Sequence, residues 1–423
     1  MIGADLVVRN IGLLATLAGP VPRRGREMED AGIITGAAVA AARGRIVYAG
    51  PEDGLAAVTP APDAVTLDAG GAAVVPGLVD AHTHLAYVGD RDDEIRRRLA
   101  GASYGEIAAA GGGIVKTVAA TRAASREDLA AAIAARLDEM LLQGTTTAEV
   151  KSGYGLSTAD EVRSLEAIRA AAQDHPVGVV PTFLGAHEVP PEHRGDRGRY
   201  VDLLAEEMIP EVARRGLAIF CDVFCEQGVF TVAESRRILL AARAHGMKLR
   251  LHADELAWTG GAELAAELQA RSADHLLFVS DVGARALAEA GCAATLLPAA
   301  AFYLRLGRFA PARSLMEAGV PVALGTDANP GGGLSPSLSF AMAVACFGMG
   351  LSLEAALAAA TLNAAYSLDV HREVGSLEEG KRADLVVLRS RHLLDLVRVG
   401  VGAVATVVKD GRVVVRDGRR VAA

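Results

Sequence analysis

The chain has 423 residues, of which 51% are hydrophobic and 22% are charged. This composition provides a sizeable core and excludes a disordered protein, and the length fits one large barrel-type domain or two to three smaller ones at about 100–200 residues per domain. The formal net charge is −8 and aromatic residues make up only 4%, so the chain lacks the basic surface that is typical of nucleic-acid binding.

The four cysteines are too few for a disulfide framework. Cys221 and Cys225 are four residues apart in a predicted strand, and Cys292 and Cys346 are single and distant, so the second pair that a zinc knuckle needs is missing. We expect buried free thiols and a reducing, cytoplasmic location. Neither a targeting segment nor an apolar run that could span a membrane is evident, so we expect no membrane partner.

The two ends of the chain resemble each other. Short apolar strands broken at glycines are predicted near the start and near the end, at Ala4–Arg9, Ala38–Gly50, Ala383–Leu388 and Val404–Gly418. Lys409–Arg412 is predicted to be the turn of a hairpin. Because chain termini commonly lie close together, we expect one small β-sandwich domain built from residues 1–73 and 371–423.

Residues 74–370 alternate short apolar strands with stretches of helical period. Predicted helices include Ser125–Gln143, Thr158–Gln173 and Thr231–His245, with Ser125 and Thr158 as expected N-caps. The predicted strands are Val74–Val79, Thr145–Val150, Val177–Leu184, Ala218–Phe224, Lys248–Leu251, Arg271–Asp274, Ala293–Leu297 and Val322–Thr326. Parallel strands joined by crossover helices predict an α/β fold, a (β/α)8 TIM barrel of residues 74–370. A doubly wound open sheet is the alternative.

Polar residues follow the C-terminal ends of these strands, where barrel enzymes place their sites. His82 and His84 follow the first strand, and alternate residues of an extended chain point to the same side, so both imidazoles can reach one metal ion. His252 follows the fifth strand, His275 the sixth and Asp327 the eighth. Histidines combined with a carboxylate form a ligand set that suits zinc or iron. Each residue taken singly also fits an ordinary polar role.

Longer motifs add a family resemblance that extends over essentially the whole chain. The segments that carry it are "EVKSGYGL" at Glu149–Leu156, "TFLGAHEVP" at Thr182–Pro190, "FCEQGVF" at Phe224–Phe230, "LHADEL" at Leu251–Leu256, "SADHL" at Ser272–Leu276, "DANPG" at Asp327–Gly331 and "GKRADLVVL" at Gly380–Leu388. With His82-x-His84 they resemble the imidazolonepropionase family of the amidohydrolase superfamily. The resemblance implies a hydrolase of histidine degradation, which opens the cyclic amide of 4-imidazolone-5-propanoate to N-formimidoyl-L-glutamate.

Two other functions stay open at this point. The same histidine and carboxylate residues would serve a metal-dependent aminohydrolase (deaminase) of a purine or pyrimidine base. The alternative that is not an enzyme is a non-catalytic scaffold that acts through assembly. Such proteins typically lose the metal-binding residues, whereas this chain retains them.

The resemblance implies one metal ion per chain, zinc or iron, held by His82, His84, His252 and Asp327. Superfamily members with two metals need a bridging group, often a carboxylated lysine at the fourth strand. Here that strand is followed by Glu226 without a lysine, and Lys151 follows the second strand. Glu226 as a bridge between two metals is the alternative.

The same resemblance implies the catalytic roles. The metal polarises a carbonyl and activates water, while Glu255 is the expected general acid/base. His275 is expected to hydrogen-bond the attacking water or the developing oxyanion, and Asp327 could also take a proton. The alternative for Glu255 is a surface glutamate that caps the following helix.

The substrate carries a propanoate carboxylate, which requires a cation. Arg91 matches the substrate-binding arginine of the family and can bind a carboxylate through two hydrogen bonds, although the charge-rich run Arg91–Arg98 could also be a solvated helix. The other expected contacts are Tyr104, Tyr154, His187, Glu255, Asn329, Gly331 and Gly332. The family usually has Ser or Thr where this chain has Gly332, so that hydroxyl contact is lost. The resemblance also implies a homodimer that acts on a small molecule and binds no nucleic acid.

Overall fold

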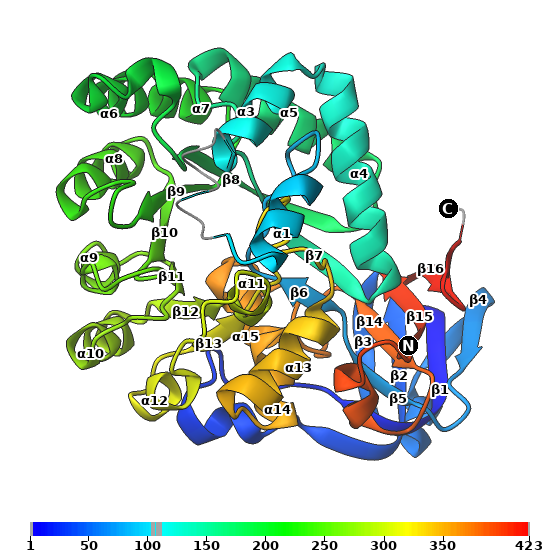
Figure 1. Cartoon of the computed structure of the whole chain (residues 1–423). Coiled ribbons are helices and arrows are strands. Elements are labelled where there is room, and N and C mark those ends of the chain that lie inside the picture. Colours follow the sequence, from blue (N-terminus) through cyan, green and yellow to red (C-terminus); the bar gives the residue numbers. More distant parts are fainter. Residues whose placement is uncertain (1–2, 103–105, 107–111, 422–423) are drawn as a thin grey trace.

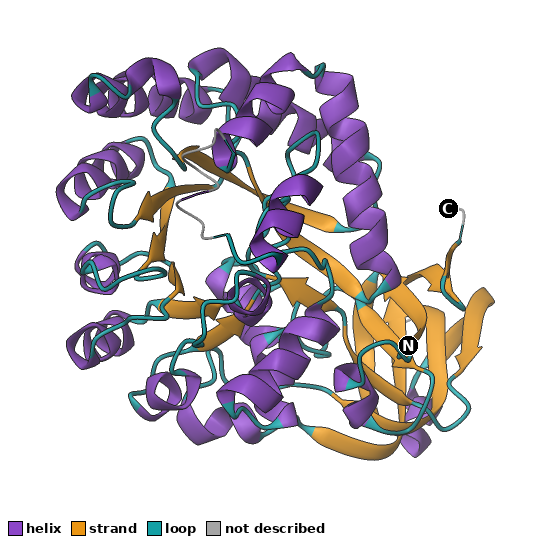
Figure 2. Cartoon of the chain, viewed as in Figure 1, coloured by secondary structure: helices purple, strands orange, loops and turns teal. Residues whose placement is uncertain are grey.

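The computed structural model describes residues 3–102, 106 and 112–421 and contains two separate sheets (Figure 1). One is an eight-stranded parallel sheet from the middle of the chain, and the other is a nine-stranded sheet formed by strands from both ends. Figure 2 shows helices around the outside of the parallel sheet, with the second sheet beside it near the two ends of the chain. The predicted fold class is confirmed.

One strand, β5, joins the two ends of the chain in the terminal sheet. β5 (Ala73–Pro76) lies parallel to β1 (Gly3–Ala15) and antiparallel to β14 (Leu385–Leu388). The other strands of this sheet are β2 (Ile33–Ala42), β3 (Arg45–Pro51), β4 (Thr59–Asp68), β15 (Val404–Lys409), β16 (Arg412–Arg416) and β17 (Arg419–Arg420). The division of the chain into residues 1–73 plus 371–423 and residues 74–370 stays a proposal.

The predicted hairpin at Lys409–Arg412 is confirmed. Lys409 pairs with Arg412 in the antiparallel ladder between β15 and β16. Asp410 and Gly411 have φ angles of 48° and 73°, the left-handed values that a type I′ turn requires at both central residues.

The first predicted strand, Val74–Val79, is divided between the two sheets. Its first half belongs to β5 of the terminal sheet, and its second half to β6 (Leu78–Asp80) of the parallel sheet. Gly77 lies where the chain crosses, and a Cβ there would come within 2.2 Å of Thr146 Oγ1, so the close approach requires glycine. Both halves are apolar and buried, so hydropathy alone does not separate them.

The parallel strands follow one another around the barrel in chain order. They are β6 (Leu78–Asp80), β7 (Thr145–Lys151), β8 (Gly178–Ala186), β9 (Phe220–Cys225), β10 (Lys248–Ala253), β11 (Ser272–His275), β12 (Ala293–Leu296) and β13 (Val322–Leu324). A doubly wound sheet would reverse its order at a switch point, so that alternative is wrong. The segments after β6 and β13 meet through a parallel bridge between Thr83 and Ala328, and Asp327 N donates to His82 O at 2.9 Å.

Helices cover the outer face of the barrel sheet (Figure 2). The α-helices of the described part of the chain are α1 (Asp92–Leu99), α3 (Ile114–Ala123), α4 (Arg126–Leu142), α5 (Thr158–Gln173), α6 (Arg197–Leu203), α7 (Ile209–Arg214), α8 (Val232–Ala244), α9 (Gly261–Glu267), α10 (Asp281–Ala290), α11 (Pro298–Tyr303), α12 (Ala312–Glu317), α13 (Leu338–Met349), α14 (Leu353–Ala359) and α15 (Leu362–Ser367). Of these, α1 and α11 lie in front of the barrel in Figure 1. The predicted cap of α4 is confirmed, because Ser125 Oγ accepts from Asp128 N. The cap of α5 is Ser157, one residue before the predicted Thr158, and it accepts from Asp160 N.

The core consists largely of Ala, Val, Leu and Ile side chains between the barrel strands and their helices. A second apolar cluster lies in the terminal sheet. The cysteines are free thiols, and three of them are buried. No helix among the described residues has the length and apolar character needed to cross a membrane.

Candidate active site

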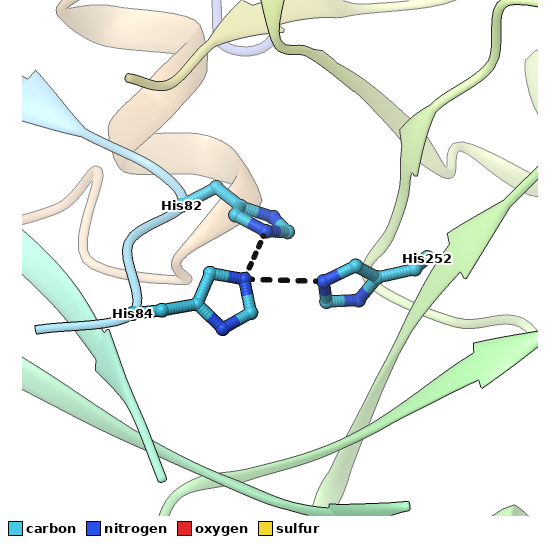
Figure 3. A group of neighbouring side chains, drawn as sticks. All are labelled: His82, His84 and His252. Carbon is cyan, nitrogen blue, oxygen red and sulfur yellow. Dashed lines mark hydrogen bonds between the residues drawn. The ribbon is translucent and has the colours of Figure 1, made fainter. Parts of the chain in front are cut away.

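Three imidazoles converge at the C-terminal end of the barrel strands (Figure 3). His82 and His84 follow β6, and His252 lies in β10. The Nε2 atom of His84 lies 3.1 Å from Nε2 of His82 and 3.3 Å from Nε2 of His252. Within the described part of the chain, this is the one group of three or more His, Cys, Asp or Glu residues that is compact enough to hold a metal ion.

Asp327 completes this group from the other side. It follows β13, and its Oδ1 lies 3.3 Å from His84 Nε2 and 3.6 Å from His82 Nε2. Its φ of 53° places the backbone in the left-handed region, which is uncommon for a residue other than glycine and is frequent at functional sites. The structure therefore brings together all four predicted ligands.

The protonation of these rings fits a metal ion. His82 Nδ1 lies 2.7 Å from Asp274 Oδ2, so Nδ1–H donates to the carboxylate and Nε2 carries the lone pair. His252 Nδ1 lies 3.1 Å from Asp222 Oδ2, which is an ion-pair contact without the geometry of a hydrogen bond. Burial lowers the pKa of His82 and of His84 well below the ordinary value. Imidazoles whose Nε2 atoms face one another have the donor chemistry that a metal ion requires.

A buried ionic network lies behind the histidines. It consists of Glu149, Lys151, Asp222, Arg250 and Asp274, all fully buried. Lys151 Nζ lies 2.7 Å from Asp222 Oδ2 and 2.8 Å from Glu149 Oε1. Arg250 Nη2 donates to Asp274 Oδ2 at 3.0 Å. Buried charges are costly unless they are paired, so these ion pairs hold Asp274 and Asp222 in place beside His82 and His252.

Glu255 and His275 lie beside the converging imidazoles. Glu255 Oε1 is 3.6 Å from His275 Nδ1. Glu255 is only 7% exposed, so it is not a surface residue. The carboxylate that holds the start of α9 belongs to its neighbour Asp254, which accepts from Gly261 N and Ala262 N. The helix-capping alternative for Glu255 is therefore wrong.

The electrostatic surroundings suit proton transfer by Glu255. Burial raises the pKa of Glu255 well above its ordinary value, and the charges of Asp327 and Glu226 raise it further. Burial lowers the pKa of His275 to about 3, so this ring is neutral. The Nε2 atom of His275 is buried without a hydrogen-bond partner among the described residues, and the ring lines the pocket described next. A carboxyl group with a raised pKa is suited to general acid–base catalysis near neutral pH.

A pocket of about 680 Å³ opens above these groups. Its lining includes the predicted substrate contacts Arg91, Tyr154, His187, Glu255, Asn329, Gly331 and Gly332. The remaining predicted contact, Tyr104, lies outside the described residues. A concave pocket with a few polar groups over a candidate metal site is the usual form of a small-molecule site.

Arg91 is a buried residue of the pocket wall and not part of a solvated surface. It is 5% exposed, and its Nε donates to Glu94 Oε2 at 2.8 Å, with Nη2 2.7 Å from the same oxygen. A Cβ on Gly331 would lie 2.1 Å from Arg91 Nη1. One edge of the Arg91 guanidinium therefore binds Glu94, and the guanidinium packs directly against Gly331, which has no side chain.

The aromatic side of the pocket is built around His187. Its Nδ1 lies 3.0 Å from Gly153 O, so Nδ1–H donates and Nε2 is left as an acceptor. The ring stacks on His84, with centroids 4.9 Å apart. Tyr154 packs edge-on against His187. These contacts fix the His187 ring beside the candidate metal ligands.

Asn329 shapes the loop after β13 from within. Its Oδ1 accepts from Gly331 N at 2.9 Å and from Gly332 N at 2.6 Å, and its Nδ2 donates to Asp327 O at 2.7 Å. The amide and the two backbone N–H groups, expected to contact substrate, therefore bond to one another in this structure. They hold the loop that carries Asp327.

Sequence reasoning missed Arg98, which also lines the pocket. Its Nη1 donates to Gly331 O at 2.8 Å, and it is 7% exposed. Arg98 lies on α1 seven residues after Arg91, which is the N-cap residue of that helix, and residues at this spacing share one helix face. That spacing is the sequence signal that could have identified it.

Comparisons with known proteins agree with this geometry. Residues 73–414 match the model of the amidohydrolase family. Relatives named imidazolonepropionase from Symbiobacterium thermophilum and Geobacillus kaustophilus are 55% and 49% identical to this chain, and the alignments cover 98% of it and 98% and 99% of the relatives. The chain belongs to the amidohydrolase family and, within it, to the imidazolonepropionase group.

Solved structures of other amidohydrolase-like enzymes share the fold. An adenosine deaminase from Xanthomonas campestris with bound zinc has a TM-score of 0.72 at 20% identity, covering 99% of this chain and 95% of that one. A triazine hydrolase variant has a TM-score of 0.74 at 19% identity, covering 99% and 96%. At this identity the likeness establishes the fold alone.

Proposed function

We propose that this chain hydrolyses the cyclic amide of 4-imidazolone-5-propanoate to N-formimidoyl-L-glutamate, a step of histidine degradation. The names of the relatives at 43–55% identity support this activity. The observation that carries it is the arrangement of one site: four candidate ligands, with Glu255 and His275 beside them and Arg91 on the wall of the same pocket.

The family and the converging imidazoles fit a single divalent metal ion. We assign its ligands as His82, His84, His252 and Asp327, and its identity as zinc or iron, because imidazole and carboxylate suit both. When bound, such an ion supplies a Lewis acid that polarises the ring carbonyl and lowers the pKa of water towards about 7.

Glu255 moves the proton in this proposal. Its carboxylate takes a proton from the water whose oxygen attacks the ring carbonyl carbon, and returns it to the ring nitrogen as the amide C–N bond breaks. The raised pKa of Glu255 favours the second half-step, because a carboxyl group that holds its proton more tightly than usual can carry that proton to the ring nitrogen. His275 is neutral and donates a hydrogen bond to the developing oxyanion, and the second oxygen of Asp327 provides a further proton acceptor.

The pocket wall recognises the rest of the substrate. Arg91 binds the propanoate carboxylate through the N–H groups that Glu94 leaves unused, and a charge-assisted bond of this kind is stronger than a neutral one. His187 Nε2 accepts from the imidazolone ring, while Tyr154 and Tyr104 supply phenolic hydrogen bonds. Asn329, Gly331 and Gly332 act by shaping the loop against which the substrate lies. We also propose that the enzyme is a cytoplasmic homodimer without nucleic-acid or membrane partners.

One assay tests this function against the deaminase alternative. The purified, metal-loaded protein is mixed with 4-imidazolone-5-propanoate, and ring opening is followed by ultraviolet absorbance, with cytosine and guanine as parallel substrates. We expect loss of the imidazolone chromophore alone. Release of ammonia from either base, with the imidazolone unchanged, would establish the deaminase function instead.

A further inference from the structure

Glu226 occupies the position after the fourth barrel strand, where a two-metal enzyme would need its bridging group. The structure gives its carboxylate a different use. Oε2 accepts from Glu255 N at 2.9 Å and from Leu256 N at 2.8 Å, and Oε1 accepts from Gln227 N at 2.8 Å. Glu226 is 1% exposed, both of its oxygens accept from backbone N–H groups, and it is not a member of the compact group of His82, His84 and His252.

These bonds act on the segment that carries Glu255. Glu226 lies 29 residues before Glu255 in sequence, and it reaches across from β9 to the segment that follows β10. A carboxylate that accepts from two consecutive N–H groups fixes the backbone there, because such charge-assisted bonds are short and directional.

A second carboxylate holds the opposite side of the same segment. Asp254 has a left-handed φ of 52°, and its oxygens accept from Thr259 N, Gly261 N and Ala262 N. Glu255 thus lies between two buried carboxylates that accept mainly from backbone N–H groups, although Asp254 also accepts from the hydroxyl of Thr259. The direction of its own side chain, toward His275, is set by these neighbours.

We infer that Glu226 is a positioning residue for proton transfer, which holds the backbone of Glu255 so that its carboxylate faces the reacting groups. This inference rests on the proposed function of Glu255. In this inference Glu226 binds no metal ion, and Glu226 affects hydrolysis only through the position of Glu255. A misplacement of about 1 Å at a reacting group can slow catalysis about 100-fold, so a small shift of this backbone has a large kinetic effect.

The test begins with Glu226→Ala and Glu226→Gln in the metal-loaded enzyme. We expect Glu226→Ala to keep one metal per chain and a KM within about threefold of the parent, while kcat falls about 10–100-fold. Glu226→Gln keeps an acceptor oxygen but loses the charge, so its kcat should lie between those of the parent and Glu226→Ala. Asp384→Ala is the matched control, because Asp384 is also buried and accepts from a backbone N–H, that of Asp410, in the terminal sheet. It should lower the unfolding temperature and leave kcat unchanged.

A double-mutant cycle then separates positioning from general support of the fold. In the Glu255→Gln background the group to be positioned no longer transfers protons, so adding Glu226→Ala should slow hydrolysis no further. The inference would be overturned if the two substitutions together slowed hydrolysis by the product of their separate factors, which corresponds to additive free energies. It would also be overturned if either folded Glu226 variant had a kcat like that of the parent. Loss of metal from Glu226→Ala would overturn it as well. If Glu226→Ala does not fold, Glu226→Gln carries the same cycle.

The outcomes distinguish this inference from the proposed function. If the parent enzyme does not hydrolyse the imidazolone, the proposed function is wrong. If Glu255→Gln turns over like the parent, the proposed role of Glu255 is wrong, and so is the inference about Glu226. If Glu255→Gln is inactive but the effects of the Glu226 and Glu255 substitutions are additive in free energy, only the inference about Glu226 is wrong.

Discussion

His82 Nδ1 donates to Asp274 Oδ2 at 2.7 Å, and this carboxylate also accepts from Arg250 Nη2 at 3.0 Å. The bond fixes the tautomer and the orientation of the His82 ring, so that Nε2 is presented to the other imidazoles before any metal arrives. Asp274 and the guanidinium behind it are fully buried, which gives the ring little freedom to turn. Orientation of this kind raises the affinity of a site for its metal.

Asp274→Asn should therefore weaken metal binding. The amide keeps the size of the side chain but is a poorer acceptor for Nδ1–H, and it removes one of the two carboxylates that pair with Arg250. Loss of such a partner typically lowers metal affinity about 10–100-fold. Competition between the apoprotein and a chromophoric chelator measures the affinity directly. Asp138→Asn is the matched control, because Asp138 pairs with His175 at 3.0 Å in a similar bond outside the site; equal losses in both variants would contradict the expectation.

Removal of a proposed ligand should remove the metal. His252→Ala leaves two imidazoles and Asp327, so the metal content of the purified protein should fall from about one per chain to well below it, and hydrolysis should stop. Circular dichroism should show the barrel intact, since the ring lies at the end of β10 and not among the outer helices. A parent content of two metals per chain, measured by elemental analysis, would contradict the single-metal assignment.

Glu255→Gln keeps the shape of the side chain and cannot accept a proton. General acid–base groups contribute about 100–10,000-fold to rate, so kcat should fall within that range. Metal content should stay near the parent value, because Glu255 is not an assigned ligand, and KM should change little, because the amide can still hydrogen-bond to the substrate. Steady-state kinetics with elemental analysis checks both; turnover within a few-fold of the parent would mean that another group moves the proton.

Arg91→Met should weaken binding of the propanoate arm. A charge-assisted hydrogen bond contributes roughly 1.5–3 kcal/mol, which corresponds to a loss in binding of about 10–100-fold or more at 1.4 kcal/mol per tenfold. An imidazolone without the propanoate arm should be an equally poor substrate for parent and variant. Arg126→Met replaces an exposed arginine on α4. It should change neither the binding of the full substrate nor the turnover of the imidazolone without the propanoate arm. Normal binding of the full substrate by Arg91→Met would exclude this arginine from recognition.

Gly331→Ala tests the same contact from the other side of the pocket. Its Cβ would lie 2.1 Å from Arg91 Nη1, so the guanidinium must shift and KM should rise. The effect should be largely absent in an Arg91→Met background, because the clash then disappears. Gly195→Ala is the control, since an added Cβ there meets nothing within 4 Å. Equal effects of Gly331→Ala in both backgrounds would show that it acts on the loop and not on Arg91.

Much of the site could be predicted because polar residues directly follow the C-terminal ends of the apolar strands, and those strands could be located from the alternation of strands and helices along the chain. His82, His84, His252, His275 and Asp327 all follow strands that the pattern located. The division of Val74–Val79 between two sheets could not be predicted, because both halves are equally apolar. The pairing of Arg91 with Glu94 and the use of Glu226 as a backbone acceptor depend on distances between separate elements, which local patterns do not encode.

The meeting of the first and last barrel strands has a consequence for biosynthesis. Thr326 Oγ1 bonds to Asp80 Oδ2 at 2.6 Å across this junction, although the two residues are 246 positions apart. His82 and His84 lie on one side of the junction and Asp327 on the other. A nascent chain therefore carries two of the four proposed metal ligands long before the fourth emerges from the ribosome. If the assignment of these ligands is correct, the barrel must close before the metal site is complete, and we expect a translation product truncated before Asp327 to be inactive.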